Sequence, residues 1–173
     1  MSSELDALAA RVVAQAAEKR LSIVTAESCT AGALATLLAD TPGAGECFGG
    51  GFVTYTKACK TSLLDIPESL IEAHTAVSRE VAERMATGAL AASGTDLAIA
   101  VTGVLGPEPD QDGNPVGLVH IAVAALSGTM SHREIRAPET SRDVNRKRAM
   151  KEAMALLTKV LEECPSSPQP APL

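Results

Sequence analysis

The stretch Thr25-Ala26-Glu27-Ser28-Cys29-Thr30-Ala31-Gly32 joins two segments of different character. Before the turn, Leu21, Ile23 and Val24 are apolar and partly β-branched, which is typical of a strand. After it, the apolar residues of segment 33–38 have the pattern of a helix. A strand that turns into a helix presents its turn residues at the mouth of a sheet, beside the N–H groups of the first helical turn. We therefore expect the hydroxyl of Ser28 beside a potential oxyanion or phosphate site, although serine in such a turn often only caps the helix.

The composition is that of a globular domain with a substantial core. The chain has 173 residues, of which 46% are hydrophobic and 21% charged. We predict a single domain over residues 1–164 and a disordered, proline-rich tail over residues 165–173. The net charge of −6 argues against a nucleic-acid or membrane-surface binder, because such proteins carry a basic face.

The N-terminal residues, the longest apolar segments and the cysteine spacing indicate where the protein is located and which sites it contains. The first residues are polar and acidic, unlike a secretory signal, and no segment has the roughly 20 consecutive apolar residues of a membrane span. A cytoplasmic location is therefore expected. The four cysteines form no CxxC pair and have no histidine at ligand spacing, so we predict neither a structural zinc site nor a redox motif.

Along the chain, helical and strand patterns alternate. Helices are predicted over residues 3–19, 33 to about 40, 58–64, 68–74, 78–92 and 141–163, and strands over residues 21–26, 52–56, 96–101, 116–125 and 130–136. The glycines at positions 49–51 precede the second strand. They either let the backbone closely approach another backbone or a ligand, or serve only a bulge or a tight bend. The order predicts an α/β fold, a three-layer α/β/α sandwich with a mixed, mostly parallel sheet of about five strands.

Three turns in this scheme follow the ends of strands. They are residues 27–32, 55–60 and 102–107. In open α/β sheets, ligands bind outside the carboxyl ends of the strands. If the three strands run parallel, these turns share one crevice, and we expect Ser28 to be a site residue.

Five ordered motifs over residues 5–162 resemble the C-terminal domain of the competence/damage-inducible protein CinA, whose standalone members are PncC-type nicotinamide-nucleotide amidohydrolases. The motifs are Ala26-Glu27-Ser28-Cys29-Thr30-Ala31-Gly32, Gly50-Gly51-Phe52-Val53-Thr54-Tyr55 with Lys60, Val77-Ser78 with Met85-Ala86-Thr87-Gly88-Ala89, Thr102-Gly103-Val104-Leu105-Gly106-Pro107, and Pro115-Val116-Gly117-Leu118-Val119-His120-Ile121-Ala122. Arg142 and Arg146 align with two further arginines of the family.

The chain departs from the family pattern at three places. Tyr55-Thr56-Lys57 replaces Tyr-Ser-Asn, Gly106-Pro107-Glu108-Pro109-Asp110 replaces a glycine-rich loop, and Thr140-Ser141 replaces Gly-Asp. Each change alters a segment that the resemblance places near the substrate. The identity of the substrate is therefore less constrained than the fold.

The resemblance implies hydrolysis of the carboxamide of nicotinamide mononucleotide, in a homodimer without a cofactor. Amide hydrolysis needs a nucleophile, a base and an oxyanion site. Ser28 is the candidate nucleophile, and no histidine lies in a strand-end turn. Lys60, which aligns with the family lysine, is the preferred base once burial lowers its pKa, and Lys57 is a weaker candidate.

The remaining site residues follow from the motifs. Tyr55 is expected to relay or donate a proton, Thr102 to hydrogen-bond the substrate, and Arg142 to hold a 5′-phosphate. Glu27 is either a site carboxylate or a helix cap. The substrate-binding set comprises Glu27, Thr30, Gly32, Gly50, Gly103, Gly106 and Arg142. A nucleotide-binding or partner-binding module of the same fold, without catalysis, is the alternative hypothesis.

Overall fold

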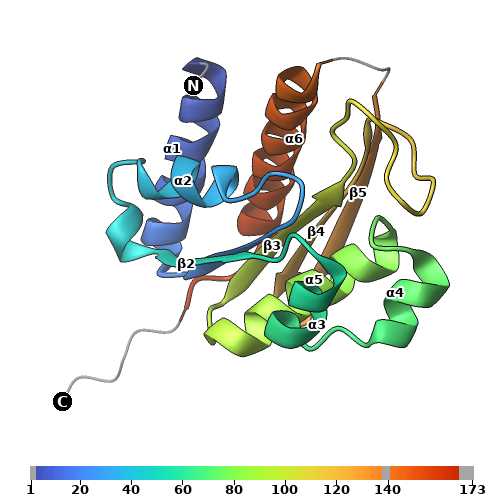
Figure 1. Cartoon of the computed structure of the whole chain (residues 1–173). Coiled ribbons are helices and arrows are strands. Elements are labelled where there is room, and N and C mark those ends of the chain that lie inside the picture. The colour runs from blue at the N-terminus through green and yellow to red at the C-terminus, as the bar shows by residue number, and fades with distance from the viewer. Residues whose placement is uncertain (1–2, 138–140, 168–173) are drawn as a thin grey trace.

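The computed structural model describes residues 3–137 and 141–167 (Figure 1). The helices are α1 (Ser3–Lys19), α2 (Ala33–Ala39), the short 3-10 helix η1 (Ala44–Glu46), α3 (Lys57–Leu64), α4 (Glu68–His74), α5 (Arg79–Ser93) and α6 (Arg142–Glu163). The strands are β1 (Ile23–Glu27), β2 (Phe48–Val53), β3 (Leu97–Gly103), β4 (Leu118–Ala125) and β5 (Met130–Arg136). The alternation of helices and strands matches the predicted order.

The five strands form one mixed sheet in the order β2-β1-β3-β4-β5. Strand β1 pairs in parallel with both β2 and β3, whereas β4 is antiparallel to both of its neighbours. All strands except β4 therefore run in the same direction. The predicted α/β fold with a mixed sheet of about five strands is confirmed, and β1, β2 and β3 end at the same edge.

Helices cover both faces of the sheet, with α1, α2 and α6 on one side and α3, α4 and α5 on the other (Figure 1). The first face is filled by large aliphatic side chains of the strands, such as Ile23, Ile99 and Ile121. The second face carries mainly alanines, among them Ala98, Ala100, Ala122 and Ala124. Because alanine side chains are small, a helix can pack close to the sheet on this face. Packing in the layer that contains α5 is therefore the more tightly constrained of the two.

The structure corrects the position of the second strand. We predict residues 52–56 from the sequence, but β2 spans Phe48–Val53 and contains all three glycines. A Cβ at Gly51 would lie 2.5 Å from Thr25 Oγ1, so only glycine lets β2 lie this close to β1. The register places Ile23 opposite Phe48 and Val24 opposite Gly50, which leaves Gly49 as the extra residue of a bulge.

The tail that we predict over residues 165–173 is described only as far as Ser167, and residues 168–173 lie outside the described residues. The Ser167 N–H donates a hydrogen bond to the carbonyl of Lys19 at 2.9 Å. Within the described residues, no helix has both the length and the apolar character needed to span a bilayer.

Candidate active site

A pocket of about 600 Å³ opens at the edge of the sheet where β1, β2 and β3 end. Its walls come from the three predicted turns, from the α4–α5 connection and from the loop after β3. The lining residues are Ser28, Tyr55, Thr56, Lys57, Ala58, Lys60, Ala76, Val77, Thr102, Gly103, Pro109, Asp110, Gln111 and Asp112. The parallel strands thus bring together turns that lie far apart in the sequence, as expected for this topology.

Ser28 and Lys60 meet at the base of this pocket. Lys60 Nζ lies 2.9 Å from Ser28 Oγ and donates a second hydrogen bond, of 2.7 Å, to the carbonyl oxygen of Thr54. Ser28 is 8% exposed and Lys60 is 1% exposed. The Thr54 carbonyl therefore fixes the direction in which the lysine points, and the amine faces the serine hydroxyl.

The position of Lys60 follows from the way α3 begins. Thr56 has an extended backbone, and its Oγ1 accepts a hydrogen bond from the Cys59 N–H at 3.1 Å, so it caps the helix. Lys60 lies one turn further on and shares the inward face of the helix with Leu64. A well-defined helix start thus directs a long cationic side chain into the protein.

Burial changes the protonation of Lys60. Removal from water disfavours the charged ammonium and lowers the pKa of Lys60 from 10.5 to about 8. The neighbouring cysteines, Cys29 and Cys59, act weakly in the opposite direction. At pH 7 roughly a tenth of the molecules would carry the neutral amine, which is the form that can accept a proton.

Cys29, beside Ser28 in the chain, is a poor second nucleophile. Its side chain is buried in the core, and this burial raises the pKa of the thiol to about 12. The thiolate is the reactive form of cysteine, so almost none is available near neutral pH. Ser28 is the nucleophile candidate that faces the pocket.

Tyr55, Thr102 and Gly103 also line the pocket, as the sequence predicts. Tyr55 is 57% exposed and lies at the pocket wall rather than in the core. The Thr102 hydroxyl donates a 2.8 Å hydrogen bond to the carbonyl of Ala76, and its oxygen keeps a lone pair that can accept from a ligand. A Cβ at Gly103 would lie 2.7 Å from the carbonyl oxygen of Leu118, so any other residue would push the strands apart.

Of the two roles that the sequence leaves open for Glu27, the structure favours the helix cap over the substrate-binding carboxylate. Its carboxylate is fully buried and accepts hydrogen bonds from the N–H groups of Gly32, Leu34 and Ala35 at 2.8–3.0 Å, and from Thr25 Oγ1 at 3.1 Å. It therefore caps α2 and occupies the N–H groups that we expect to face a ligand. Glu27 does not line the pocket.

Five further predicted substrate-binding residues, Thr30, Gly32, Gly50, Gly106 and Arg142, also lie outside the pocket lining. Gly32 has a φ of 92° and precedes α2, where a left-handed backbone requires glycine. Arg142 Nη1 donates a 3.0 Å hydrogen bond to the carbonyl of Gly106, and this bond joins the start of α6 to the loop after β3. Among the described residues, the buried Oγ1 of Thr30 has no hydrogen-bond partner.

The histidines also lie away from the pocket lining. His120 on β4 and His132 on β5 face each other, with Nδ1 of the first 3.1 Å from Nε2 of the second, and burial lowers the pKa of both. The absence of histidine from the lining agrees with the preference for lysine over histidine as the base. In the part of the chain that the structure describes, no group of three or more histidine, cysteine or carboxylate side chains could hold a metal ion.

The loop after β3 contributes lining residues that are not among the predicted site residues, although the resemblance places residues 106–110 near the substrate. Pro109, Asp110, Gln111 and Asp112 line the pocket, and Asp112 Oδ1 forms a 2.7 Å ion pair with Lys57 Nζ. The sequence predicts only a loop here, because nothing in its pattern indicates where the loop folds. Lys57, the weaker base candidate, therefore faces an acidic partner at the pocket wall rather than Ser28.

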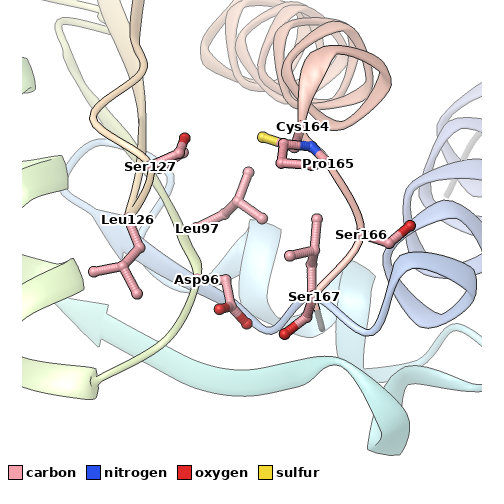
Figure 2. A pocket seen from close by; sticks show the side chains of 10 residues that line it. Asp96, Leu97, Leu126, Ser127, Cys164, Pro165, Ser166 and Ser167 are labelled. Atoms are coloured by element: carbon pink, nitrogen blue, oxygen red, sulfur yellow. The ribbon is translucent and has the colours of Figure 1, made fainter. Parts of the chain in front are cut away.

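A second pocket lies at the opposite end of the sheet (Figure 2). It has a volume of about 290 Å³ and lies between the start of β3, the β4–β5 turn and the segment that follows α6. Asp96, its charged group, already accepts hydrogen bonds from the N–H and the hydroxyl of Ser22 at 2.8 and 2.7 Å. Within the described lining there is no nucleophile paired with a base, so the first pocket is the candidate active site.

Comparison with known proteins places this chain in a family. The family model described as CinA C-terminal domain matches residues 5–161. A CinA-like protein of Mycobacterium tuberculosis is 44% identical over 146 residues, which are 84% of this chain and 34% of that protein. A putative competence-damage inducible protein of Symbiobacterium thermophilum is 50% identical over 108 residues, which are 62% of this chain and 25% of that protein. The chain thus spans about a third or less of these curated relatives.

Solved structures with CinA-related names superpose on this chain over nearly their whole length. The competence/damage inducible protein CihA of Agrobacterium tumefaciens superposes with a TM-score of 0.89 at 35% identity, over 94% of this chain and 98% of that one. The CinA superfamily protein ECK1530/EC0983 of Escherichia coli gives a TM-score of 0.86 at 32% identity, over 92% of each chain. The chain belongs to the CinA C-terminal domain family.

Proposed function

We propose that this chain is an amidohydrolase that converts nicotinamide mononucleotide to nicotinate mononucleotide and ammonia, with Ser28 as nucleophile and Lys60 as base. The observation that carries the proposal is the buried lysine amine 2.9 Å from the serine hydroxyl at the base of a pocket. The choice of substrate comes from the resemblance of the sequence motifs to nicotinamide-nucleotide amidohydrolases.

In the proposed reaction, the neutral Lys60 amine removes the proton from Ser28 Oγ as the oxygen attacks the amide carbon. The tetrahedral intermediate then collapses, the C–N bond breaks, and the protonated Lys60 returns the proton to the leaving nitrogen, which departs as ammonia. A water molecule attacks the resulting ester, with Lys60 again taking the proton. The ester C–O bond breaks, protonated Lys60 returns the proton to Ser28 Oγ, and nicotinate mononucleotide is released.

The other pocket residues have supporting roles in this scheme. Lys60 keeps its orientation through the Thr54 carbonyl, which accepts from it at 2.7 Å. The phenol of Tyr55 lines the pocket and can exchange protons with the leaving group or with water. Thr102, through its free lone pair, can accept a hydrogen bond from the carboxamide NH₂.

An ammonia-release assay with nicotinamide mononucleotide tests the proposal. The wild-type protein should release ammonia, and Ser28→Ala and Lys60→Met should each lower the rate at least about 10³-fold, because the nucleophile and its base act as a unit. Ser62→Ala on the exposed face of α3 is the matched control and should keep the wild-type rate. Retained turnover in Ser28→Ala would remove that serine as nucleophile.

A non-catalytic binding module is the second candidate. The Lys57–Asp112 ion pair at the pocket wall favours it, because Lys57 replaces an asparagine of the family motif and Asp112 follows the segment that replaces its glycine-rich loop. Tight binding of the mononucleotide by the wild-type protein, with no ammonia released over hours, would support this alternative over catalysis.

A further inference from the structure

The positive charges at the pocket come from two lysines. Among the described lining residues, only Lys57 and Lys60 are cationic. Lys60 is buried against Ser28, where the carboxamide has to react, so it is not available to a distant group. Arg142 lies outside the lining and donates to the Gly106 carbonyl. Lys57 is therefore the cation that remains for an anionic group of a bound substrate.

Lys57 already has an anionic partner. Its Nζ lies 2.7 Å from Asp112 Oδ1, and the two side chains are 50% and 24% exposed, respectively. An ion pair this accessible to water contributes little net stability, because each charge is nearly as well solvated alone. A phosphate, with up to two negative charges and three acceptor oxygens, can therefore displace the carboxylate.

Asp112 is held in place by its loop rather than by Lys57. Asp110 Oδ1 accepts from the N–H groups of Asp112 and Asn114 at 3.0 and 2.8 Å. Asn114 Nδ2 in turn donates to Thr75 Oγ1 at 3.1 Å, which ties the loop to the α4–α5 connection. Loss of the Asp112 carboxylate would leave these contacts intact, because Asp112 enters them through its backbone.

We propose that Lys57 binds the phosphate of a phosphorylated substrate and that Asp112 competes for the same ammonium group. Together they would set the preference of the pocket between a phosphorylated amide and its unphosphorylated analogue. This inference rests on the proposed function, since it takes the carboxamide to lie at Ser28. It places a phosphomonoester site beside two departures from the family motifs: Lys57, which would bind the phosphate, replaces asparagine, and Asp110, which holds the backbone of Asp112, replaces glycine.

Isothermal titration calorimetry on the Ser28→Ala protein tests the pair without turnover. The ligands are nicotinamide mononucleotide and nicotinamide riboside, which lacks the phosphate. Asp112→Asn should tighten mononucleotide binding about threefold to fivefold, the scale of an exposed ion pair, and change riboside binding less than twofold. Lys57→Gln should weaken mononucleotide binding about tenfold and leave the riboside unaffected.

Glu108→Gln is the matched control for Asp112→Asn. It removes the same charge from an exposed residue of the same loop that does not line the pocket, so its effect on the mononucleotide should stay below twofold. An equal effect of the two variants would overturn the specific competition in favour of general electrostatics. A Lys57→Gln protein with unchanged mononucleotide affinity, or Ser28→Ala protein that binds neither ligand, would also overturn it.

The two proposals can fail separately. If the wild-type protein releases no ammonia from either compound, the proposed reaction fails, whereas calorimetry still reports whether Lys57 recognises phosphate. If ammonia is released but the Lys57 and Asp112 variants treat both ligands alike, the reaction stands and the phosphate site is refuted.

Discussion

The lowered pKa of Lys60 predicts a particular pH dependence of stability. In the folded protein the pKa is about 8, against 10.5 for the unperturbed side chain. The difference of about 2.5 corresponds to roughly 3 kcal/mol, since one pKa unit is about 1.4 kcal/mol. The side chain is 1% exposed, so solvent screening does not reduce this figure greatly.

The sign follows from which state binds the proton. Below pH 8 both states are protonated, and the folded state bears the whole cost of a buried ammonium. Between pH 8 and 10.5 the unfolded chain keeps the proton while the folded protein has lost it, so the cost disappears as the pH rises. Lys60 therefore destabilises the protein near neutral pH, and this destabilisation fades toward pH 10.

The measurement compares wild type with Lys60→Met by urea unfolding at pH 7 and pH 10. The free energy of unfolding of wild type, minus that of the variant, should rise by about 2 to 3 kcal/mol between the two pH values. Other titrating groups cancel in this difference. Lys147→Met, which changes an exposed lysine of α6, is the matched control and should give a difference that does not vary with pH. A flat difference for Lys60→Met, within about 0.5 kcal/mol, would refute the lowered pKa.

Three further predictions concern the rate and the packing. The kcat/KM for ammonia release should rise about tenfold per pH unit up to pH 8 and then level off, because only neutral Lys60 accepts a proton; a profile that falls over this range would exclude it as the base. Glu27→Gln should lower the free energy of unfolding by about 2 to 4 kcal/mol in urea, since an amide cannot accept from all four donors, and a loss below 0.5 kcal/mol would contradict the capping role. Gly88→Ala should cost about 1 to 3 kcal/mol because its Cβ would lie 2.2 Å from the carbonyl oxygen of Leu64, whereas Gly45→Ala, whose Cβ meets nothing within 4 Å, should cost less; equal losses would refute the steric argument.

Local patterns along the chain were sufficient to predict the elements and their order. The turns after β1 and β3, and the segment after β2 that holds Tyr55 and Lys60, were expected to meet if the strands were parallel, and they do line one pocket. That inference depends only on the direction of neighbouring strands. The second strand was misplaced because its glycines look like breakers in isolation. The requirement for glycine becomes visible only in the contact between Gly51 and Thr25 on the neighbouring strand.

The hydrogen-bonding roles within the site depend on distances that no local pattern contains. Glu27 lies beside Ser28 in the sequence, yet its carboxylate points toward α2 and not into the pocket. Arg142 is separated from Gly106 by 36 residues and Lys57 from Asp112 by 55, so neither pairing can be anticipated from spacing. Side-chain direction at the end of a strand is set by the neighbouring element, which is why residue types were easier to predict than their partners.

The capped start of α2 also bears on how the site responds to anions in its surroundings. Glu27 behaves as a ligand tethered to its own receptor, and a tethered group competes at an effective concentration that a dissolved ion at ordinary levels does not match. Sulfate, phosphate or a substrate carboxylate would therefore not replace it at the N–H groups of Gly32, Leu34 and Ala35. We therefore expect the turn that carries Ser28 to keep its conformation when a ligand enters the pocket, so that the Ser28 hydroxyl is oriented before binding.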